Sequence, residues 1–266
     1  MNVAEKVGLV NSYVDSNNDP MWWHSIDFGD GIWSDGGKGK HLGVLPEERM
    51  AIEMKGWDLP EDYFRGKRVL DVGCWDGFHA FYAEQHGASE VVALDYDCWV
   101  GKTWSTKEGF DIAKRVLESN VKDVTMDIMN ATPANLGTFD VIIFAGVLYH
   151  LHDNLKALDI LKSLLNREGE LFIETTVTER LNLEKIPICV YHAGSSINDD
   201  ATNFWSPNRL CLTKMLEDTG FEVIEVRNTE PINDELMTRA IGYCKVNSSH
   251  RLGSVAWRDH LSKQED

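Results

Sequence analysis

The chain has 266 residues, 43% of them hydrophobic and 26% charged, proportions typical of a soluble globular protein. Its formal net charge is -17, which disfavours nucleic acid as a partner, because binding to phosphates depends largely on lysine and arginine. No apolar stretch is long enough to cross a bilayer, and no signal peptide is visible, so we expect a cytoplasmic protein with no membrane partner.

The N-terminal part, residues 1–64, is expected to form a cap segment. Spaced valines predict an amphipathic helix over residues 3–16. Residues 20–43 are rich in glycine and aspartate but hold three tryptophans, and burial of each ring is worth roughly 2 kcal/mol, so we expect an ordered segment. Pro46 begins PEERMAIEMKGW, a predicted helix with proline in its first turn.

From residue 65 onward, short apolar segments alternate with helical patterns. The strand-like segments are KRVLDV, EVVALD, VKDVTMD, FDVIIFAG and ELFIETTV. The helical patterns are GFHAFYAEQHG, TKEGFDIAKRVLES and DNLKALDILKSLLNREG. This alternation is typical of βαβ units and predicts an α/β fold with a parallel sheet.

The alternation lapses near residues 178–205, where we expect an irregular insertion. A helix should follow, with Ser206 as its N-cap. FEVIEVRN and LMTRAIGYCKV have no helix-length segment between them, which predicts a hairpin-like pair of strands. The main domain is therefore expected at residues 65–246, with a polar tail at 247–266.

The five cysteines are scattered and include no CxxC pair. Their number is odd, so a disulfide framework is not expected, and neither is a structural zinc site. We expect reduced thiols and no metal ion.

The turn after the first strand of the main domain reads Gly73-Cys74-Trp75-Asp76-Gly77. A dinucleotide fingerprint, G-x-G-x-x-G, needs a second glycine where a pyrophosphate approaches the backbone. A bulky tryptophan follows Cys74 instead, so binding of NAD or FAD is not expected.

The longer string DVGCWDG, which begins at Asp71, resembles motif I (DxGxxxG) of the class I S-adenosylmethionine (SAM) methyltransferases. The resemblance implies a Rossmann-like sheet, mostly parallel with an antiparallel C-terminal strand, flanked by helices and preceded by the cap. It also implies that Asp95 binds the ribose hydroxyls and that Asp127 with Ile128 holds the adenine. SAM carries a ribose diol and no phosphate, so carboxylates suit it. Alternatively, each aspartate only forms a turn at the end of its strand.

A second resemblance involves GVLYH, which begins at Gly146, and the later segments GELFIET, NFWSPNRLCLTKMLEDTGFEVIEV and TRAIGYCK. Together these resemble the tRNA wobble-uridine carboxymethyltransferase group, also described as methoxyuridine-type methyltransferases, over roughly residues 65–246. That group uses carboxy-SAM to alkylate 5-hydroxyuridine. The resemblance implies that Tyr149 and Arg239 bind the additional carboxylate of carboxy-SAM.

Methyl transfer from a sulfonium is an in-line displacement that depends mainly on alignment, with a general base where the acceptor must lose a proton. His150 is the candidate base because imidazole titrates near neutral pH, with Tyr149 beside it and His24 in reserve. The candidate cofactor-binding residues are Asp71, Gly73, Cys74, Gly77, Asp95, Tyr96, Asp127, Ile128, Ala145, Gly146 and Trp33. The candidate acceptor-binding residues are Arg239, Trp22, Trp205, His192 and Glu174.

An aromatic roof, made of Trp22 and Trp33 from the cap with Phe204 and Trp205, favours a small planar or cationic acceptor. Alternatively, these rings only pack the cap onto the core. The first hypothesis is thus a SAM-dependent methyltransferase acting on a small molecule. The alternatives are a tRNA wobble-uridine methyl- or carboxymethyltransferase, and a protein that cyclises, cleaves or only binds SAM.

Overall fold

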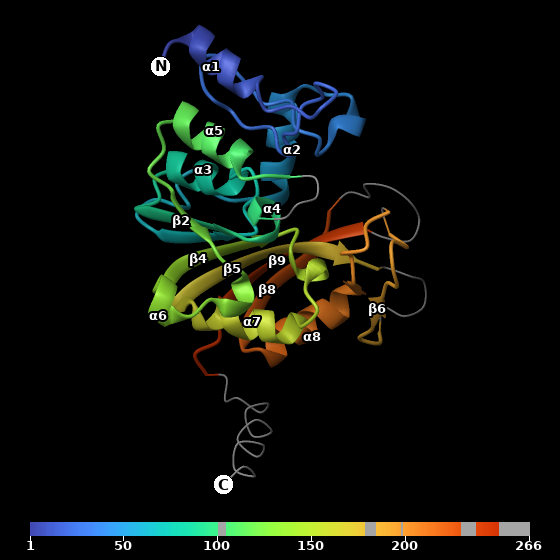
Figure 1. Cartoon of the computed structure of the whole chain (residues 1–266). Coiled ribbons are helices and arrows are strands. Elements are labelled where there is room, and N and C mark those ends of the chain that lie inside the picture. Colours follow the sequence, from blue (N-terminus) through green and yellow to red (C-terminus); the bar gives the residue numbers. More distant parts are fainter. Residues whose placement is uncertain (101–104, 179–184, 198, 230–237, 250–266) are drawn as a thin grey trace. The chain divides into compact units, whose positions relative to one another are not determined.

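The computed structural model describes residues 1–100, 105–178, 185–197, 199–229 and 238–249 (Figure 1). The chain divides into two compact units, Met1–Asn130 and Ala131–Asp266. The expected boundaries after residues 64 and 246 stay a prediction. Most of the expected tail lies outside the described residues.

The cap segment begins with helix α1 (Val3–Val10), whose N-terminus is capped by Asn2. The prediction of a helix over residues 3–16 was wrong at its C-terminal end. Asp15 accepts hydrogen bonds from two later backbone amides, and this local turn competes with helical hydrogen bonding. The 3-10 helix η1 (Lys40–Leu42) and helix α2 (Pro46–Trp57) follow, and α2 begins with its proline as predicted.

The first unit contains a parallel three-stranded arrangement with the order β3-β2-β1. Its strands are β1 (Arg68–Val72), β2 (Glu90–Asp95) and β3 (Lys122–Thr125). Its remaining helices are α3 (Phe78–Gln85), α4 (Asp97–Val100), α5 (Glu108–Val116) and the 3-10 helix η2 (Ile128–Asn130). Strands β1 and β2 are mostly apolar and are buried except at their first residues, as expected for parallel strands covered by helices.

The second unit contains the strand order β4-β5-β9-β8. Strand β4 (Phe139–Ala145) is parallel to β5 (Leu165–Val177), while β9 (Thr238–Val246) is antiparallel to both β5 and β8 (Phe221–Asn228). Its helices are α6 (Pro133–Leu136), η3 (Leu148–His150), α7 (Asn154–Ser163) and α8 (Arg209–Asp218). Figure 1 shows α7 and α8 along one face of these strands. The predicted pair of C-terminal strands is confirmed.

The expected irregular insertion contains a short antiparallel pair, β6 (Cys189–Tyr191) and β7 (Trp205–Pro207). The prediction that Ser206 caps α8 was wrong. Ser206 pairs with Val190 in this ladder, and Asn208 caps the helix because its Oδ1 accepts from Cys211 N at 2.8 Å.

The seven longer strands are joined in parallel pairs in the first unit and in mixed pairs in the second, with helices between them. This arrangement confirms the predicted α/β class with a mostly parallel set of strands and an antiparallel C-terminal strand.

Candidate functional site

The turn between β1 and α3 is built from left-handed residues. Gly73, Trp75 and Gly77 have φ values of 71°, 50° and 88°, and the last two surround the buried Asp76. Gly73 N donates to the carbonyl oxygen of Leu94 on β2 at 2.8 Å, which fixes the turn against the end of that strand. The chain therefore makes a tight turn here, directly before helix α3, and glycine adopts such left-handed conformations without strain.

The Asp71 carboxylate at the end of β1 is almost fully buried, and its Oδ2 accepts from Ala80 N in the first turn of α3 at 2.9 Å. Burial raises the pKa of Asp71 to about 6, although the charges of His79 and His24 lower it. The strand and the helix are thus held together by one carboxylate.

The Asp95 carboxylate at the end of β2 belongs to the same turn. Its Oδ2 accepts from Trp75 N at 2.9 Å, and its Oδ1 accepts from Cys98 N at 3.0 Å. Burial raises the pKa of Asp95 to about 6, while these two backbone hydrogen bonds lower it. Tyr96, which follows, is exposed, and Cys74 is buried.

Asp127 lies beside the end of β2. Met126 N donates to the Asp95 carbonyl oxygen at 3.1 Å, and Asp127 Oδ1 accepts from Met129 N at 2.8 Å. Ile128 is buried in η2. The structure therefore brings Asp71, Gly73, Asp95 and Asp127 together around the carboxyl ends of β1 and β2, and their role toward the cofactor stays a prediction.

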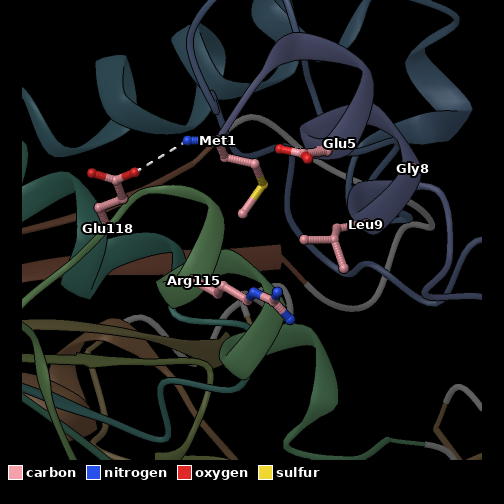
Figure 2. A pocket seen from close by; sticks show the side chains of 6 residues that line it. All are labelled: Met1, Glu5, Gly8, Leu9, Arg115 and Glu118. Atoms are coloured by element: carbon pink, nitrogen blue, oxygen red, sulfur yellow. Dashed lines mark ion pairs between the residues drawn. The ribbon is translucent and has the colours of Figure 1, made fainter.

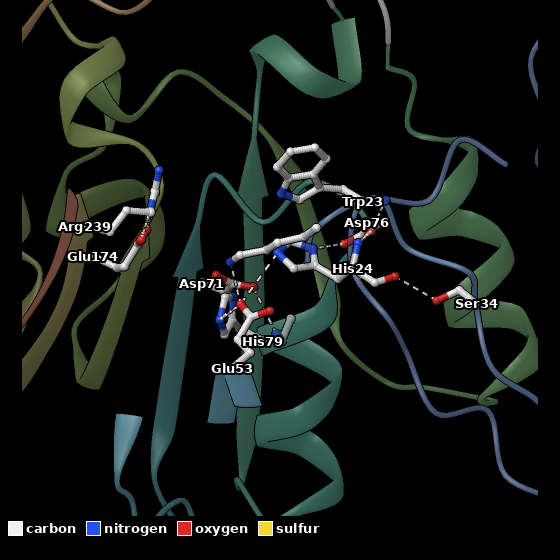
Figure 3. Close-up of polar contacts among 11 residues, drawn as sticks. Trp23, His24, Ser34, Glu53, Asp71, Asp76, His79, Glu174 and Arg239 are labelled. Carbon is white, nitrogen blue, oxygen red and sulfur yellow. Dashed lines mark hydrogen bonds and ion pairs between the residues drawn. The ribbon is translucent and has the colours of Figure 1, made fainter. Parts of the chain in front are cut away.

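The cap segment contacts this turn through its aromatic residues. Trp23 stacks on Trp75 with ring centroids 5.0 Å apart, and the Trp23 and His24 amides both donate to Asp76 Oδ2. His24 Nδ1 lies 2.6 Å from Asp76 Oδ1, so the histidine ring is held as well (Figure 3). Burial alone would raise the pKa of Asp76, but the His24 charge and these hydrogen bonds outweigh it and lower that pKa.

Trp22 and Trp33, the other two tryptophans of residues 20–43, differ in exposure. Trp22 is buried, donates from Nε1 to the Val10 carbonyl oxygen, and contacts Tyr13 and Phe28 edge-on. Trp33 is half-buried and pairs with Asp27 in an isolated bridge. These contacts favour the alternative in which Trp22 packs the cap, and its role toward an acceptor stays a prediction.

In the second unit, one cluster joins four predicted residues at the end of β4. Glu174 on β5 pairs with Arg239 on β9 through both Nε and Nη2 of the guanidinium (Figure 3). Arg239 Nη1 lies 3.5 Å from the Tyr149 hydroxyl. Gly146, with φ of 73°, follows Ala145 and donates from its amide to the Glu174 carbonyl oxygen at 2.9 Å. Burial opposes the charge on Arg239, but Glu174 and Tyr149 outweigh it and raise the pKa of the guanidinium.

His150 lies beside this cluster. Its ring contacts Tyr149 with centroids 4.1 Å apart, and its Nδ1 lies 2.9 Å from both the carbonyl and hydroxyl oxygens of Thr202. A bond to the carbonyl requires a hydrogen on Nδ1, which makes Nε2 the basic nitrogen of the neutral ring.

His192 and Trp205 come from the β6–β7 pair. His192 Nε2 lies 2.9 Å from Ser206 Oγ, and burial lowers the pKa of this histidine. Trp205 packs on Tyr191 with ring centroids 5.0 Å apart. Phe204, next to it, donates from its amide to the Tyr149 carbonyl oxygen at 2.8 Å, which links this pair to η3.

Sequence reasoning assigned no role to Asp76, Trp23, Glu53 or His79, all of which contact the turn or His24. Asp76 lies inside the quoted motif, and an acidic residue directly before the last glycine of the turn was the available signal. Its partner His24 lies 52 positions earlier, and such a separation leaves no local pattern.

A separate hollow of about 530 Å³ lies beside α1 (Figure 2). It is lined by Met1, Glu5, Gly8, Leu9, Arg115 and Glu118, none of which is a predicted site residue. Within the described ranges, no helix has both the length and the apolar character needed to span a membrane.

A family model described as "Methyltransferase domain" matches residues 56–226. A tRNA U34 carboxymethyltransferase from Pseudomonas aeruginosa (strain LESB58) is 37% identical over 120 residues, which are 45% of this chain and 35% of that protein. A protein of the same name from Helicobacter pylori (strain Shi470) is 30% identical over 176 residues, 64% of this chain and 62% of that one. The chain thus spans about a third of the length of the Pseudomonas relative.

Two solved structures are similar over most of the chain. The N-terminal domain of EvdMO1 with SAH bound shares 18% identity, with a TM-score of 0.58 over 92% of this chain and 98% of that one. The [4+2]-cyclase SpnF shares 15% identity, with a TM-score of 0.57 over 91% of this chain and 93% of that one. Both show the same fold and confirm the predicted Rossmann-like class.

The curated relatives confirm the predicted resemblance to the tRNA U34 carboxymethyltransferase group. The family model includes motif I at residues 71–77 and covers most of the expected main domain, residues 65–246. The chain belongs to the methyltransferase-domain family of enzymes.

Proposed function

We propose that this protein transfers a methyl group from SAM to a nucleophile on a small-molecule acceptor. The observation that carries the proposal is the Asp95 carboxylate, anchored by the Trp75 amide at the motif I turn, with Asp71 and Asp127 beside it. Carboxylates at strand ends suit a ribose diol and an adenine, and EvdMO1, a protein of the same fold, has been solved with SAH bound.

The Glu174–Arg239 pair supports SAM rather than carboxy-SAM as the donor. In the resembling group, Tyr149 and Arg239 would bind the donor's additional carboxylate. Here Glu174 already accepts from two nitrogens of the guanidinium. A second carboxylate would have to share one arginine with Glu174, and like charges at such a site repel.

Competitive binding of SAM and carboxy-SAM, measured by calorimetry, tests this choice of donor. We expect SAM to bind at least roughly tenfold more tightly, a difference of about 1.4 kcal/mol. Glu174→Gln should narrow the preference, because it removes the competing negative charge. Glu170→Gln on the same strand, next to Tyr243 and Lys245, is the matched control. Tighter binding of carboxy-SAM by the unaltered protein would contradict the assignment.

For the chemical step, we assign the general base to His150. Its Nε2 would accept the proton of the acceptor as the acceptor atom attacks the methyl carbon. In this in-line displacement the carbon–sulfur bond of the sulfonium would break as the new bond forms, and the sulfur would keep the electron pair as a neutral thioether. Alignment supplies about 7–11 kcal/mol in such reactions, and a base adds about 10²–10⁴-fold. His24 is bonded to Asp76 and stacked on Phe78, which favours a positioning role for it.

A small acceptor is favoured over tRNA by the net charge of -17, whereas the names of the curated relatives favour tRNA. Incubation with methyl-labelled SAM, together with either a metabolite extract or bulk tRNA, separates the two. Label in the low-molecular-weight fraction supports the proposal, and label in tRNA overturns it. Consumption of SAM without any acceptor would indicate an enzyme that cyclises or cleaves SAM, because one fold can host different reactions.

We also propose a cytoplasmic location, which the odd number and scattered positions of the cysteines favour. Fractionation of the source cells tests it, and recovery in an extracellular fraction would contradict it.

A further inference from the structure

Three ligand-type side chains, two from the cap segment and one from α3, meet outside the residues assigned to the donor or the acceptor. His24 comes from the cap, Glu53 from α2 and His79 from α3 (Figure 3). One potential ligand atom from each lies within 4.8 Å of the other two. His79 Nε2 is 3.4 Å and His24 Nε2 is 3.9 Å from the same oxygen, Glu53 Oε1. We call these three residues the His2Glu cluster.

We propose that the His2Glu cluster is a binding site for one divalent transition metal ion of the zinc class. Two imidazoles and one carboxylate form a donor set that binds zinc in proteins, with a fourth position left for water. Bond lengths of about 2.0–2.2 Å around a tetrahedral ion put ligand atoms roughly 3.4 Å apart, so small side-chain movements suffice. No metal was expected from the sequence, because its cysteines lack ligand spacing and these three residues are widely separated.

The His24 ring is held in the orientation that a metal ligand needs. Its Nδ1 lies 2.6 Å from the Asp76 carboxylate, which leaves Nε2 on the side of Glu53. A histidine ligand usually donates its other N–H to a carboxylate in this way, and that partner fixes the tautomer and the ring. Asp76 is itself buried and held by two backbone amides, so this arrangement is rigid.

His79 supplies an independent observation. Its side chain is 7% exposed, and its Nε2 makes no hydrogen bond of good geometry with any residue in the described ranges. A buried polar atom without such a bond is costly unless something else coordinates it. A metal ion on Nε2, shared with Glu53, would supply that coordination.

Lys38 is the competitor for this site. Its Nζ lies 2.6 Å from Glu53 Oε1, and its side chain is 30% exposed, so a bound metal ion would have to displace it from this oxygen. Burial alone would raise the pKa of Glu53, but Lys38, His24 and His79 outweigh it and hold that pKa well below its usual value. A bound ion would link two parts of the cap segment, the loop that carries His24 and helix α2, to helix α3.

The test is a titration of the tag-free full chain with Co²⁺ after treatment with a chelator, without SAM or any acceptor. We expect one Co²⁺ per chain, the visible absorption bands of a four- or five-coordinate site, and displacement by Zn²⁺. Glu53→Gln and His79→Asn should each weaken binding at least roughly 10²-fold, and Asp76→Asn roughly 10–100-fold. Lys38→Met should strengthen it several-fold. His86→Asn, at the end of the same helix and stacked on Tyr82, is the control that should bind normally.

The absence of Co²⁺ uptake by the unaltered chain would overturn the proposal. Equal uptake by folded Glu53→Gln or His79→Asn would do the same, as would weaker binding by Lys38→Met. Far-UV circular dichroism checks the fold of each variant. Thermal melting of the unaltered chain needs no variant: Zn²⁺ should raise Tm in proportion to the logarithm of its concentration, and Mg²⁺ should not. The same Tm with and without Zn²⁺ would also contradict the proposal.

Discussion

At the scale of single residues, Asp76 is the side chain that ties the cap to motif I. It accepts from the amides of Trp23 and His24 and from the His24 ring, and it is almost completely buried. A buried carboxylate with three partners is stable only while all of them are present. The contact therefore makes the position of the cap depend on one residue of the turn.

We expect Asp76→Ala to lower the free energy of unfolding by about 3–5 kcal/mol, because it leaves His24 and two amides buried without their acceptor. Urea unfolding measures the loss. Asp19→Ala, at an exposed position of the same cap, should change it by no more than about 0.5 kcal/mol. Equal effects of the two substitutions would contradict the role given to Asp76.

The raised pKa values of Asp71 and Asp95 predict a pH dependence of SAM binding. Both groups have a pKa of about 6 in the folded chain, above the usual value, so they take up protons as the pH falls through 6. Protonation removes the negative charge of the carboxylate, and a neutral carboxyl group accepts hydrogen bonds from the ribose hydroxyls of SAM less strongly. SAM affinity should fall between pH 7 and pH 5, by roughly tenfold per carboxylate for each pH unit below 6.

Calorimetric titrations of SAM over this pH range check that prediction. Asp95→Asn cannot titrate, so its profile should be flatter than that of the unaltered chain. An affinity that rises as the pH falls, or the same slope in both proteins, would contradict the assignment.

At the scale of elements, the β1–α3 turn depends on Gly77 for two reasons. Its φ of 88° lies in the left-handed region, and an added Cβ would come within 2.4 Å of Phe81 and 2.7 Å of Phe110. Both rings are buried in the core of the first unit, so neither has room to move.

Gly77→Ala should therefore lower stability by about 2–4 kcal/mol, the sum of backbone strain and overpacking. Gly66→Ala is the matched control, since its φ is 74° and nothing lies within 4 Å of an added Cβ, so only backbone strain of about 1–2 kcal/mol applies. Thermal melting of both variants separates the two contributions. A loss in Gly77→Ala no larger than in Gly66→Ala would show that the ring contacts do not matter.

The elements that the sequence predicted well are those with a strong repeating pattern. Strands β2 and β8 and the proline-started α2 agree with the predicted segments, because short apolar or alternating runs and a first-turn proline are patterns that can be read locally in the sequence. The long first helix and the Ser206 cap were wrong, because Asp15 and Asn208 form local hydrogen bonds that periodicity does not register.

The part of the candidate site that follows a local pattern was predictable, and the long-range pairs were not. Motif I and the acidic strand ends follow a fixed spacing, so their grouping in the first unit could be expected. The Glu174–Arg239 pair and the His24–Asp76 contact join residues 65 and 52 positions apart. Only the folded chain reveals such pairs, because no local pattern connects their members.

At the scale of the whole molecule, the family model identifies a methyltransferase domain, and two observations point to different acceptors. The methyltransferase-domain model covers residues 56–226, while the net charge of -17 and the names of the relatives favour different acceptors. Both readings share one requirement, which is a donor site in the first unit that uses Asp95. A small-molecule methyltransferase and a tRNA methyltransferase would therefore both bind SAM at Asp95.

Calorimetric titration of SAM into the full chain and its Asp95→Ala variant at neutral pH tests that claim most directly. We predict one SAM per unaltered chain and a roughly 10²-fold weaker affinity in Asp95→Ala, since two hydrogen bonds to a charged group are worth about 3 kcal/mol. Asp97→Ala, at the exposed start of α4, should bind normally. No binding by the unaltered chain, or unchanged affinity in a folded Asp95→Ala variant, would contradict the account.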